Sequence, residues 1–276
     1  MNRIEKLFKE KSNGILSVFF TAGFPALKST GLIVGALEKA GVDLIEIGIP
    51  FSDPIADGPT IQDSNKVALR NGMSVKVLLE QIQKIRKEVS IPIILMGYLN
   101  PVLQYGFEKF CTEAASNGVD GLILPDMPLE EFEQDYRTIT EKNGLINIFM
   151  VSPTTSDERI RKIDSISRGF IYAISSSSTT GARSEFSNDQ AKYFIRLKDL
   201  GLKNPFLVGF GISNHQTFSK ASEYSSGAIV GSAFINLLKE AKDINQEIEQ
   251  FIEQIRPGSI SQKKSSNYDH TVKIND

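Results

Sequence analysis

Short apolar runs rich in β-branched residues recur along the chain, without the clean apolar and polar alternation of a strand that has one wet face. Such continuous runs are typical of strands covered on both faces, as in a parallel sheet. Segments with helical spacing of apolar residues separate them, for example Val77, Leu78, Ile82 and Ile85. Eight strands are predicted, at 15–21, 44–50, 92–98, 121–126, 146–152, 169–175, 205–211 and 227–233.

The regular alternation of strand and helix indicates one α/β domain. Eight strand–helix units in about 240 residues match a (β/α)8 TIM barrel, whereas a doubly wound open sheet normally stops at about five or six strands. Ahead of the first strand, Ile4, Leu7 and Phe8 predict a short amphipathic helix that plugs the barrel floor. After the last strand, the apolar pattern predicts an extra C-terminal helix to Pro257. We therefore expect a single barrel domain over residues 1–257.

The segment 258–276 differs from the rest of the chain. It is polar, rich in Ser and Lys, and shows no periodicity. Such a segment buries too little apolar surface to offset the entropy lost on ordering. It predicts a disordered tail, to which the sequence assigns no function.

Charge and composition narrow the range of partners. The chain has 31 Lys and Arg against 33 Asp and Glu, and no long basic run before the tail, so nucleic acid is not an expected partner. The apolar runs are far shorter than the roughly 18 residues that span a bilayer, so no membrane association is expected. Cys111 has no partner for an internal disulfide, and Cys111, His215 and His270 do not form a zinc cluster. These features predict a cytoplasmic protein without a metal.

One carboxylate, Glu46, interrupts an otherwise apolar run. An ionised group there costs several kcal/mol unless it is paired or protonated. With a period of two, Glu46 shares a face with Leu44 and Gly48, while the bulky isoleucines face the helices, which places Glu46 in the barrel interior. Desolvation would raise its pKa toward neutrality, as a general acid/base needs. The alternative is a core glutamate paired with an Arg or Lys from a neighbouring strand.

The connection 51–73 after that strand is longer than usual and follows a strand carboxyl end, where barrel enzymes place their active sites. Its Asp53 and Asp57 stand beside Pro and Gly, which is ordinary turn chemistry. A loop that folds back over the barrel mouth would instead bring Asp57 opposite Glu46 and separate acid and base roles. Asp53, Asp57 and Asp63 lack the spacing of a calcium loop, so no metal site is expected.

Glycines end the last two predicted strands. Gly209 and Gly211 end the seventh, and Gly231 and Ser232 end the eighth before a helix. Phosphate sites in barrels recur at these two loops, where glycines let backbone N–H groups approach the anion. Glycine is also the default turn residue, so the positions alone fit either interpretation. The chain has no P-loop or dinucleotide-binding motif, so no nucleotide cofactor is expected.

A second long connection, 176–188, follows the sixth predicted strand. The Ser- and Thr-rich run from Ser175 to Thr180 fits a flexible polar loop, and its position also suits a lid that closes over substrate. Tyr98 and Tyr172, within or at the end of strands, are typical of core tyrosines whose hydroxyl finds a partner.

Taken together, the loop motifs resemble those of the tryptophan synthase α subunit family. The run LIEIGIPFSDPIADGPTIQ, from Leu44 to Gln62, is close to the signature of that family. Further matches follow in chain order: FTAGFP at 20–25, NP at 100–101 with YG at 105–106, PDMP at 125–128, TGAR at 180–183, GFGIS at 209–213 and GS at 231–232. The resemblance covers residues 1–257 and leaves the tail outside.

The resemblance implies retro-aldol cleavage of indole-3-glycerol phosphate to indole and glyceraldehyde 3-phosphate in tryptophan biosynthesis, without a cofactor. It implies that Glu46 protonates indole C3 and takes the proton of the glycerol hydroxyl, and that Asp57 binds the indole N–H and stabilises positive charge on the ring. The substrate-binding residues that it implies are Phe19, Tyr98 and Tyr172 around the indole, Gly181, Gly211, Gly231 and Ser232 at the phosphate, and Thr180.

The family also implies a partner. That partner is the β subunit, which carries pyridoxal phosphate and receives indole through a tunnel in an α2β2 complex. The run Ser175 to Thr179 departs from the family, in which many members have bulkier or basic residues. Two alternatives remain: a free-standing indole-glycerol phosphate lyase, and a non-catalytic regulatory subunit that binds phosphate ligands. The presence of both Glu46 and Asp57 favours an enzyme.

Overall fold

The strands close into a single parallel ring. The computed structural model describes residues 1–174, 187–209 and 211–259. Its strand segments are β1 (Ile15–Thr21), β2 (Leu44–Gly48), β3 (Ile93–Met96), β4 (Gly121–Ile123), β5 (Ile146–Ile148), β6 (Met150–Val151), β7 (Ile171–Ile174), β8 (Phe206–Gly209) and β9 (Gly227–Val230). They hydrogen-bond in the order β5-β4-β3-β2-β1-β9-β8-β7-β6. The predicted (β/α)8 barrel is therefore confirmed.

The fifth predicted strand, 146–152, closes the ring in two pieces. Its first piece, β5, pairs with β4, and its second piece, β6, pairs with β7. Phe149 separates the two, and its carbonyl oxygen accepts a hydrogen bond from the Tyr172 N–H at 2.9 Å. Nine segments thus represent eight strands, because one strand changes partner halfway along.

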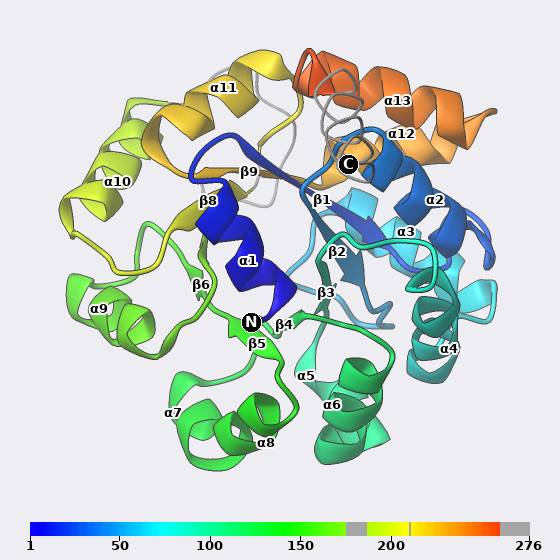
Figure 1. Cartoon of the computed structure of the whole chain (residues 1–276), viewed down its shortest axis with the longest axis horizontal. Helices are drawn as coiled ribbons and strands as arrows, with labels where there is room; N and C mark the ends of the chain where they lie inside the picture. Colours follow the sequence, from blue (N-terminus) through cyan, green and yellow to red (C-terminus); the bar gives the residue numbers. More distant parts are fainter. Residues whose placement is uncertain (175–186, 210, 260–276) are drawn as a thin grey trace, which may run out of the picture.

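Most of the helices surround the ring on its outer side, and the first helix lies across one end of it (Figure 1). They are α1 (Arg3–Glu10), α2 (Ser29–Lys39), α3 (Pro59–Arg70), α4 (Val75–Ile85), α5 (Leu99–Tyr105), α6 (Phe107–Ser116), α7 (Leu129–Glu131), the π-helical turn η1 (Phe132–Tyr136), α8 (Arg137–Lys142), α9 (Asp157–Ile166), α10 (Asn188–Asp199), α11 (His215–Tyr224), α12 (Ser232–Glu240) and α13 (Ile244–Ile255). Over the described residues, none has the length and apolar character of a membrane span.

Three details differ from the sequence prediction. Several strands end before their apolar run does, because the residues that follow leave the ladder to form loops at the barrel mouth. The connection 51–73 is not all loop, since α3 begins at Pro59, a residue whose fixed φ suits the first turn of a helix. The C-terminal apolar pattern forms two helices rather than one, and Asp243 caps the second by accepting hydrogen bonds from the N–H groups of Asn245 and Gln246.

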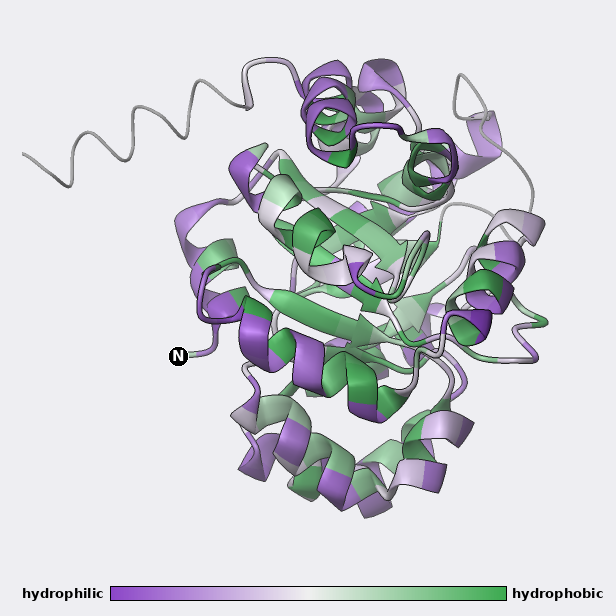
Figure 2. Ribbon diagram, turned by 90° about the vertical axis from the view of Figure 1, so that its right-hand side faces the viewer, coloured by the Kyte–Doolittle hydropathy of each residue, from purple (hydrophilic) through white to green (hydrophobic). Residues whose placement is uncertain are grey.

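Two apolar clusters follow from the alternation of side chains along the strands. Leu44 lies in the inner cluster, within the barrel, whereas Ile45 and Ile47 lie in the outer cluster between strands and helices. This is the arrangement predicted around Glu46. In Figure 2 the strands are largely green, and the helices around them carry purple residues on their outer sides.

Helix α1 closes the end of the barrel opposite the strand carboxyl ends. Its Ile4 is fully buried in the inner cluster, and Phe8 stacks on Phe170 with ring centroids 5.3 Å apart. Gly121 and Gly169 make room for Ile4, because a Cβ at either position would lie 2.9 Å from its side chain. Figure 1 looks onto this end and shows α1 lying over the middle of the ring. The predicted floor helix is confirmed.

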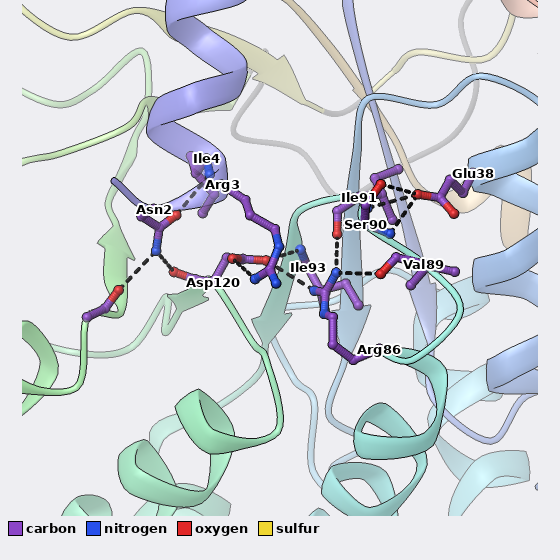
Figure 3. Close-up of polar contacts among 11 residues, drawn as sticks. Asn2, Arg3, Ile4, Glu38, Arg86, Val89, Ser90, Ile91, Ile93 and Asp120 are labelled. Atoms are coloured by element: carbon purple, nitrogen blue, oxygen red, sulfur yellow. Dashed lines mark hydrogen bonds and ion pairs between the residues drawn. The ribbon is translucent and has the colours of Figure 1, made fainter. Parts of the chain in front are cut away.

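A buried carboxylate, Asp120, fastens this floor. It is 3% exposed and accepts hydrogen bonds from Arg3 Nη1 at 2.9 Å, Arg86 Nη2 at 3.1 Å and the Ile93 N–H at 2.9 Å (Figure 3). The Asn2 side chain caps α1 and also donates to the Asp120 carbonyl oxygen at 2.8 Å. One residue thus joins α1, the end of α4 and two strands.

A second carboxylate, Asp43, repeats this arrangement just before β2. Its N–H donates to the Leu16 carbonyl oxygen at 3.0 Å, and its Oδ2 accepts from the Leu16 N–H at 2.9 Å. Lys11 binds the same carboxylate at 2.8 Å, and Arg256, from the residue after α13, binds it as well. Asp43 therefore ties the C-terminal helix to the floor.

We expect Asp120→Asn to lower the free energy of unfolding by about 3 kcal/mol, because it leaves the buried Arg86 guanidinium without its anion and also removes the ion pair with the more exposed Arg3. Urea titration followed by circular dichroism measures the change. The matched control is Asp63→Asn, which breaks an exposed pair with Lys66 and should cost at most about 0.5 kcal/mol. Similar small losses in both variants would contradict a fastening role for Asp120.

Candidate active site

Glu46 lies in β2, facing the barrel interior, and its side chain is fully buried. The Ser17 hydroxyl donates a hydrogen bond to Oε1 at 2.8 Å, and Oε2 has no hydrogen-bond partner among the described residues. Burial raises the pKa of Glu46 from its ordinary 4.5 to about 8, against a smaller lowering by the Ser17 hydrogen bond. No ion pair in the described part of the chain involves Glu46, so none of these residues provides the Arg or Lys partner of the core alternative.

Asp57 lies in the loop between β2 and α3 and binds Tyr98. The Tyr98 hydroxyl donates to Asp57 Oδ2 at 3.2 Å and accepts from the Ala56 N–H at 3.2 Å. Burial raises the pKa of Asp57, and the Tyr98 hydrogen bond opposes that rise. Phe51 packs on the Tyr98 ring with centroids 5.1 Å apart, so the loop folds back over the end of β3. The predicted return of this loop over the mouth is therefore observed.

A cavity of about 320 Å³ opens at this end of the barrel. Its walls include Phe19, Gly48, Asp57, Tyr98, Met150 and Ile174. Phe19 is the register partner of Glu46, and Gly48 is the next inward-facing residue of β2. Glu46 therefore lies just below the cavity floor, with Asp57 on the cavity wall. The mostly apolar walls and few polar groups suit a small ligand that is largely apolar.

Tyr172, on β7, occupies the same interior layer. It is 5% exposed, and burial together with the charges of Glu46 and Asp57 raises its pKa well above the ordinary value. Gly209 makes room for it, because a Cβ at that position would lie 2.3 Å from the Tyr172 hydroxyl oxygen. Gly209, which ends β8, therefore leaves space for the Tyr172 side chain. Of the two glycines of the predicted phosphate loop, Gly211 is the one left for binding phosphate.

Of the two predicted phosphate loops, the one at Gly231 lies beside the cavity wall. Gly211 has a φ of +80°, a conformation that favours glycine, and Gly231 precedes α12, whose first residue is Ser232. A Cβ at Gly231 would lie 3.7 Å from the Phe19 ring. The N-terminus of α12, a favourable position for an anion, is therefore next to the cavity. Thr180, Gly181 and the run from Ser175 to Thr180 lie outside the described residues.

The remaining candidates have structural roles. Within residues 1–174, 187–209 and 211–259, no three His, Cys, Asp or Glu side chains gather as a metal site would require. His215 Nδ1 lies 3.0 Å from the Ile255 carbonyl oxygen, which joins α11 to α13. Cys111 is buried in α6, and burial raises the pKa of its thiol to about 12. Sequence reasoning missed Ser17, although it interrupts an apolar run of β1 as Glu46 interrupts that of β2.

Comparison with known proteins identifies the family. A family model described as "Tryptophan synthase alpha chain" matches residues 5–263. The chain belongs to the tryptophan synthase alpha chain family. It is 55% identical to the tryptophan synthase alpha chain of Flavobacterium johnsoniae over 256 residues, covering 93% of this chain and 100% of the relative. It is 51% identical to that of Bacteroides thetaiotaomicron, covering 90% of this chain and 97% of the relative.

Solved structures agree with this assignment. A tryptophan synthase alpha chain of Legionella pneumophila superposes with a TM-score of 0.84 at 35% identity, covering 95% of this chain and 98% of that one. A chain of a tryptophan synthase complex from Pyrococcus furiosus gives 0.81 at 33% identity, covering 88% and 98%. The activity of a tryptophan synthase alpha chain is cleavage of indole-3-glycerol phosphate in tryptophan biosynthesis, a lyase reaction.

We expect Glu46→Gln to stabilise the protein increasingly as pH rises. Folded Glu46 keeps its proton up to about pH 8, whereas the unfolded side chain loses it above about 4.5, so wild-type stability falls between these values by up to about 1.4 kcal/mol per pH unit. Glutamine has no such dependence. Urea titrations at pH 5 and pH 8 should therefore show the advantage of the variant growing by roughly 2–4 kcal/mol.

Glu131→Gln, at an exposed position of α7, is the control for this comparison. Its difference from wild type should stay the same at the two pH values. A difference for Glu46→Gln that is equally flat would contradict the buried, protonated state of Glu46.

Proposed function

We propose that Glu46 is the acid/base of the cleavage reaction and that Asp57 is its electrostatic partner. Protonated Glu46 gives its proton to indole C3, which leaves positive charge on the indole ring. The resulting carboxylate then takes the proton of the glycerol hydroxyl next to the breaking bond. The carbon–carbon bond breaks, its electron pair restores the aromatic indole, and the hydroxyl carbon becomes the aldehyde of glyceraldehyde 3-phosphate. Glu46 ends protonated again.

The observation that carries this proposal is a buried carboxyl group that no cationic side chain of the described residues neutralises. An Arg or Lys partner would hold Glu46 ionised at neutral pH, when the first step needs a proton to give. Burial with only a hydroxyl partner keeps the group protonated near neutrality, where a general acid/base is most effective. A core glutamate that only supports the fold has no need of such an arrangement.

Asp57 fits the second role because of its position on the cavity wall. Its carboxylate lies at the mouth, held by the Tyr98 hydroxyl, and no cation in the described residues pairs with it. Its negative charge is therefore available to an indole N–H that becomes more acidic as C3 is protonated. Phe19, Tyr98 and Tyr172 are the side chains that we assign to the indole ring.

We assign the substrate phosphate to backbone N–H groups near Gly211, Gly231 and Ser232, since a helix N-terminus attracts an anion without a cationic side chain. Gly181 and Thr180 complete this proposal from the resemblance of the loop in which they occur. The cavity wall at Phe19 would then separate the indole and phosphate ends of the ligand.

We further propose that the chain works in the cytoplasm as the α subunit of an α2β2 complex with a β subunit that carries pyridoxal phosphate. Support comes from related structures that are named as tryptophan synthase complexes, including that of Pyrococcus furiosus. The loop that holds Asp57 lies at the barrel mouth, so a partner bound there would bias its closed state. Ile55 in this loop is 87% exposed.

We expect Glu46→Gln to lower turnover at least about 100-fold while the protein stays folded, because the amide cannot exchange a proton. Asp57→Asn should also lower turnover strongly, since an amide offers no charge to the cationic ring. For wild type, kcat/KM should fall as pH rises through about 8, where Glu46 loses its proton. Release of indole from indole-3-glycerol phosphate measures all three.

The control is Asp53→Asn, in the same loop but absent from the cavity wall, which should retain most of the activity. Turnover by Glu46→Gln within a few-fold of wild type would show that another group transfers the proton.

We expect a β subunit from a close relative to accelerate indole release by at least about fivefold at saturation, in line with ordinary coupling between sites. The measurement is a titration of wild-type chain with β subunit. Addition of β subunit to Glu46→Gln should leave its low rate unchanged, which excludes a contribution from the partner alone. Rapid cleavage by the isolated chain without acceleration would favour the free-standing lyase.

A further inference from the structure

We propose that Ser17 is a positioning residue for the reaction: its hydroxyl holds one oxygen of the Glu46 carboxyl group and leaves the other oxygen to exchange the proton with substrate. This inference rests on the proposed role of Glu46. With it, strand β1 contributes to proton transfer through Ser17, in addition to lining the cavity through Phe19.

The geometry around Ser17 gives its hydroxyl one function. Ser17 and Glu46 are both fully buried, and 2.8 Å separates Ser17 Oγ from Glu46 Oε1. The register partners of Ser17 on the two neighbouring strands are Leu44 and Ile229, both in the apolar inner cluster. A hydroxyl in such surroundings is costly unless it is bonded, and Glu46 is the partner it has.

The bond also determines where the carboxyl proton sits. A serine hydroxyl that donates to Oε1 occupies that oxygen as an acceptor, so the proton of the neutral acid belongs on Oε2. Oε2 is the oxygen without a hydrogen-bond partner in the described part of the chain. Ser17 lies one inward layer below Phe19, on the side away from the cavity, so Oε1 is the lower oxygen. The proton is therefore on the oxygen that Ser17 leaves for substrate.

The same bond supports the second half of the reaction. When the proton has left, the hydroxyl donates to an anion, and such charge-assisted bonds are stronger than neutral ones. Ser17 therefore stabilises the carboxylate that must form during cleavage, without the fixed positive charge that would prevent Glu46 from regaining its proton. A hydroxyl meets both demands, whereas an apolar residue meets neither.

The other groups that face Glu46 do not replace the hydrogen bond that Ser17 donates to it. From β7, Tyr172 interacts with the charge of Glu46, and its raised pKa keeps the phenol neutral. From the loop after β2, Asp57 adds negative charge to the same region. From β3 and β9, the inner cluster contributes the apolar Ile94 and Ile229. In the part of the chain that the structure describes, no Lys, Arg or His pairs with Glu46.

The decisive experiment is the pH dependence of indole release for Ser17→Ala and Ser17→Thr. We expect Ser17→Ala to move the fall of kcat/KM to higher pH by about one unit, a tenfold change in the proton equilibrium, and to lower kcat about tenfold with KM nearly unchanged. Ser17→Thr keeps the hydroxyl and should restore the wild-type profile. Ser167→Ala is the matched control, because it removes a buried hydroxyl that donates to the Ile163 carbonyl oxygen of α9, and it should leave the profile unchanged.

A direct readout avoids dependence on turnover. Difference infrared spectroscopy can follow the protonated carboxyl band that Glu46→Gln removes, and this band should titrate at higher pH in Ser17→Ala. Should that variant not fold, Ser17→Cys takes its place, because a thiol donates only weakly and should give a smaller shift in the same direction.

The outcomes separate the two proposals. If Glu46→Gln abolishes turnover and Ser17→Ala leaves both the profile and the infrared titration at their wild-type positions, Ser17 only fills space and the inference is wrong. If Glu46→Gln keeps its turnover, the assignment of Glu46 itself fails, whatever Ser17 does to the infrared band.

Discussion

A carboxyl group buried in an apolar interior, with no cationic partner among the described residues, is the constraint on which the rest of this structure depends. Ring closure and the floor helix α1 keep water from the lower part of the barrel, so Glu46 can meet substrate only from the cavity side. The surrounding layer is therefore built from apolar residues and single hydroxyl groups. The stability lost by burying the carboxyl is the physical origin of a proton available near neutral pH.

The two ends of the barrel treat carboxylates in opposite ways. At the floor, Asp43 and Asp120 each bind two cationic side chains and the N–H of a neighbouring strand, as Figure 3 shows for Asp120. At the mouth, Glu46 and Asp57 each bind one hydroxyl and no cation in the described residues. Paired charges give a rigid base, while carboxylates bonded only to hydroxyls remain free to change their protonation and to bind substrate.

Local patterns predicted the elements because each strand and helix depends mostly on its own apolar spacing. The burial of Glu46 inside the barrel was also predictable, since it follows from the position of this carboxylate within an apolar strand. The Ser17 bond, the space that Gly209 leaves for Tyr172, and the change of partner at Phe149 were not, because each depends on contacts between segments far apart in the chain. Long-range geometry of that kind is absent from the spacing of residues in a single sequence.

The contact between Asp43 and Arg256 has a consequence for the order in which the molecule is completed. Asp120 has its cationic partners, Arg3 and Arg86, among residues that precede it in the chain. Of the two cationic partners of Asp43, Lys11 is synthesised before it, whereas Arg256, which follows α13, is synthesised much later. During synthesis from the N-terminus, the Asp43 side of the barrel floor therefore lacks its Arg256 ion pair until nearly the whole barrel has been made. Docking of α13 then completes this part of the structure.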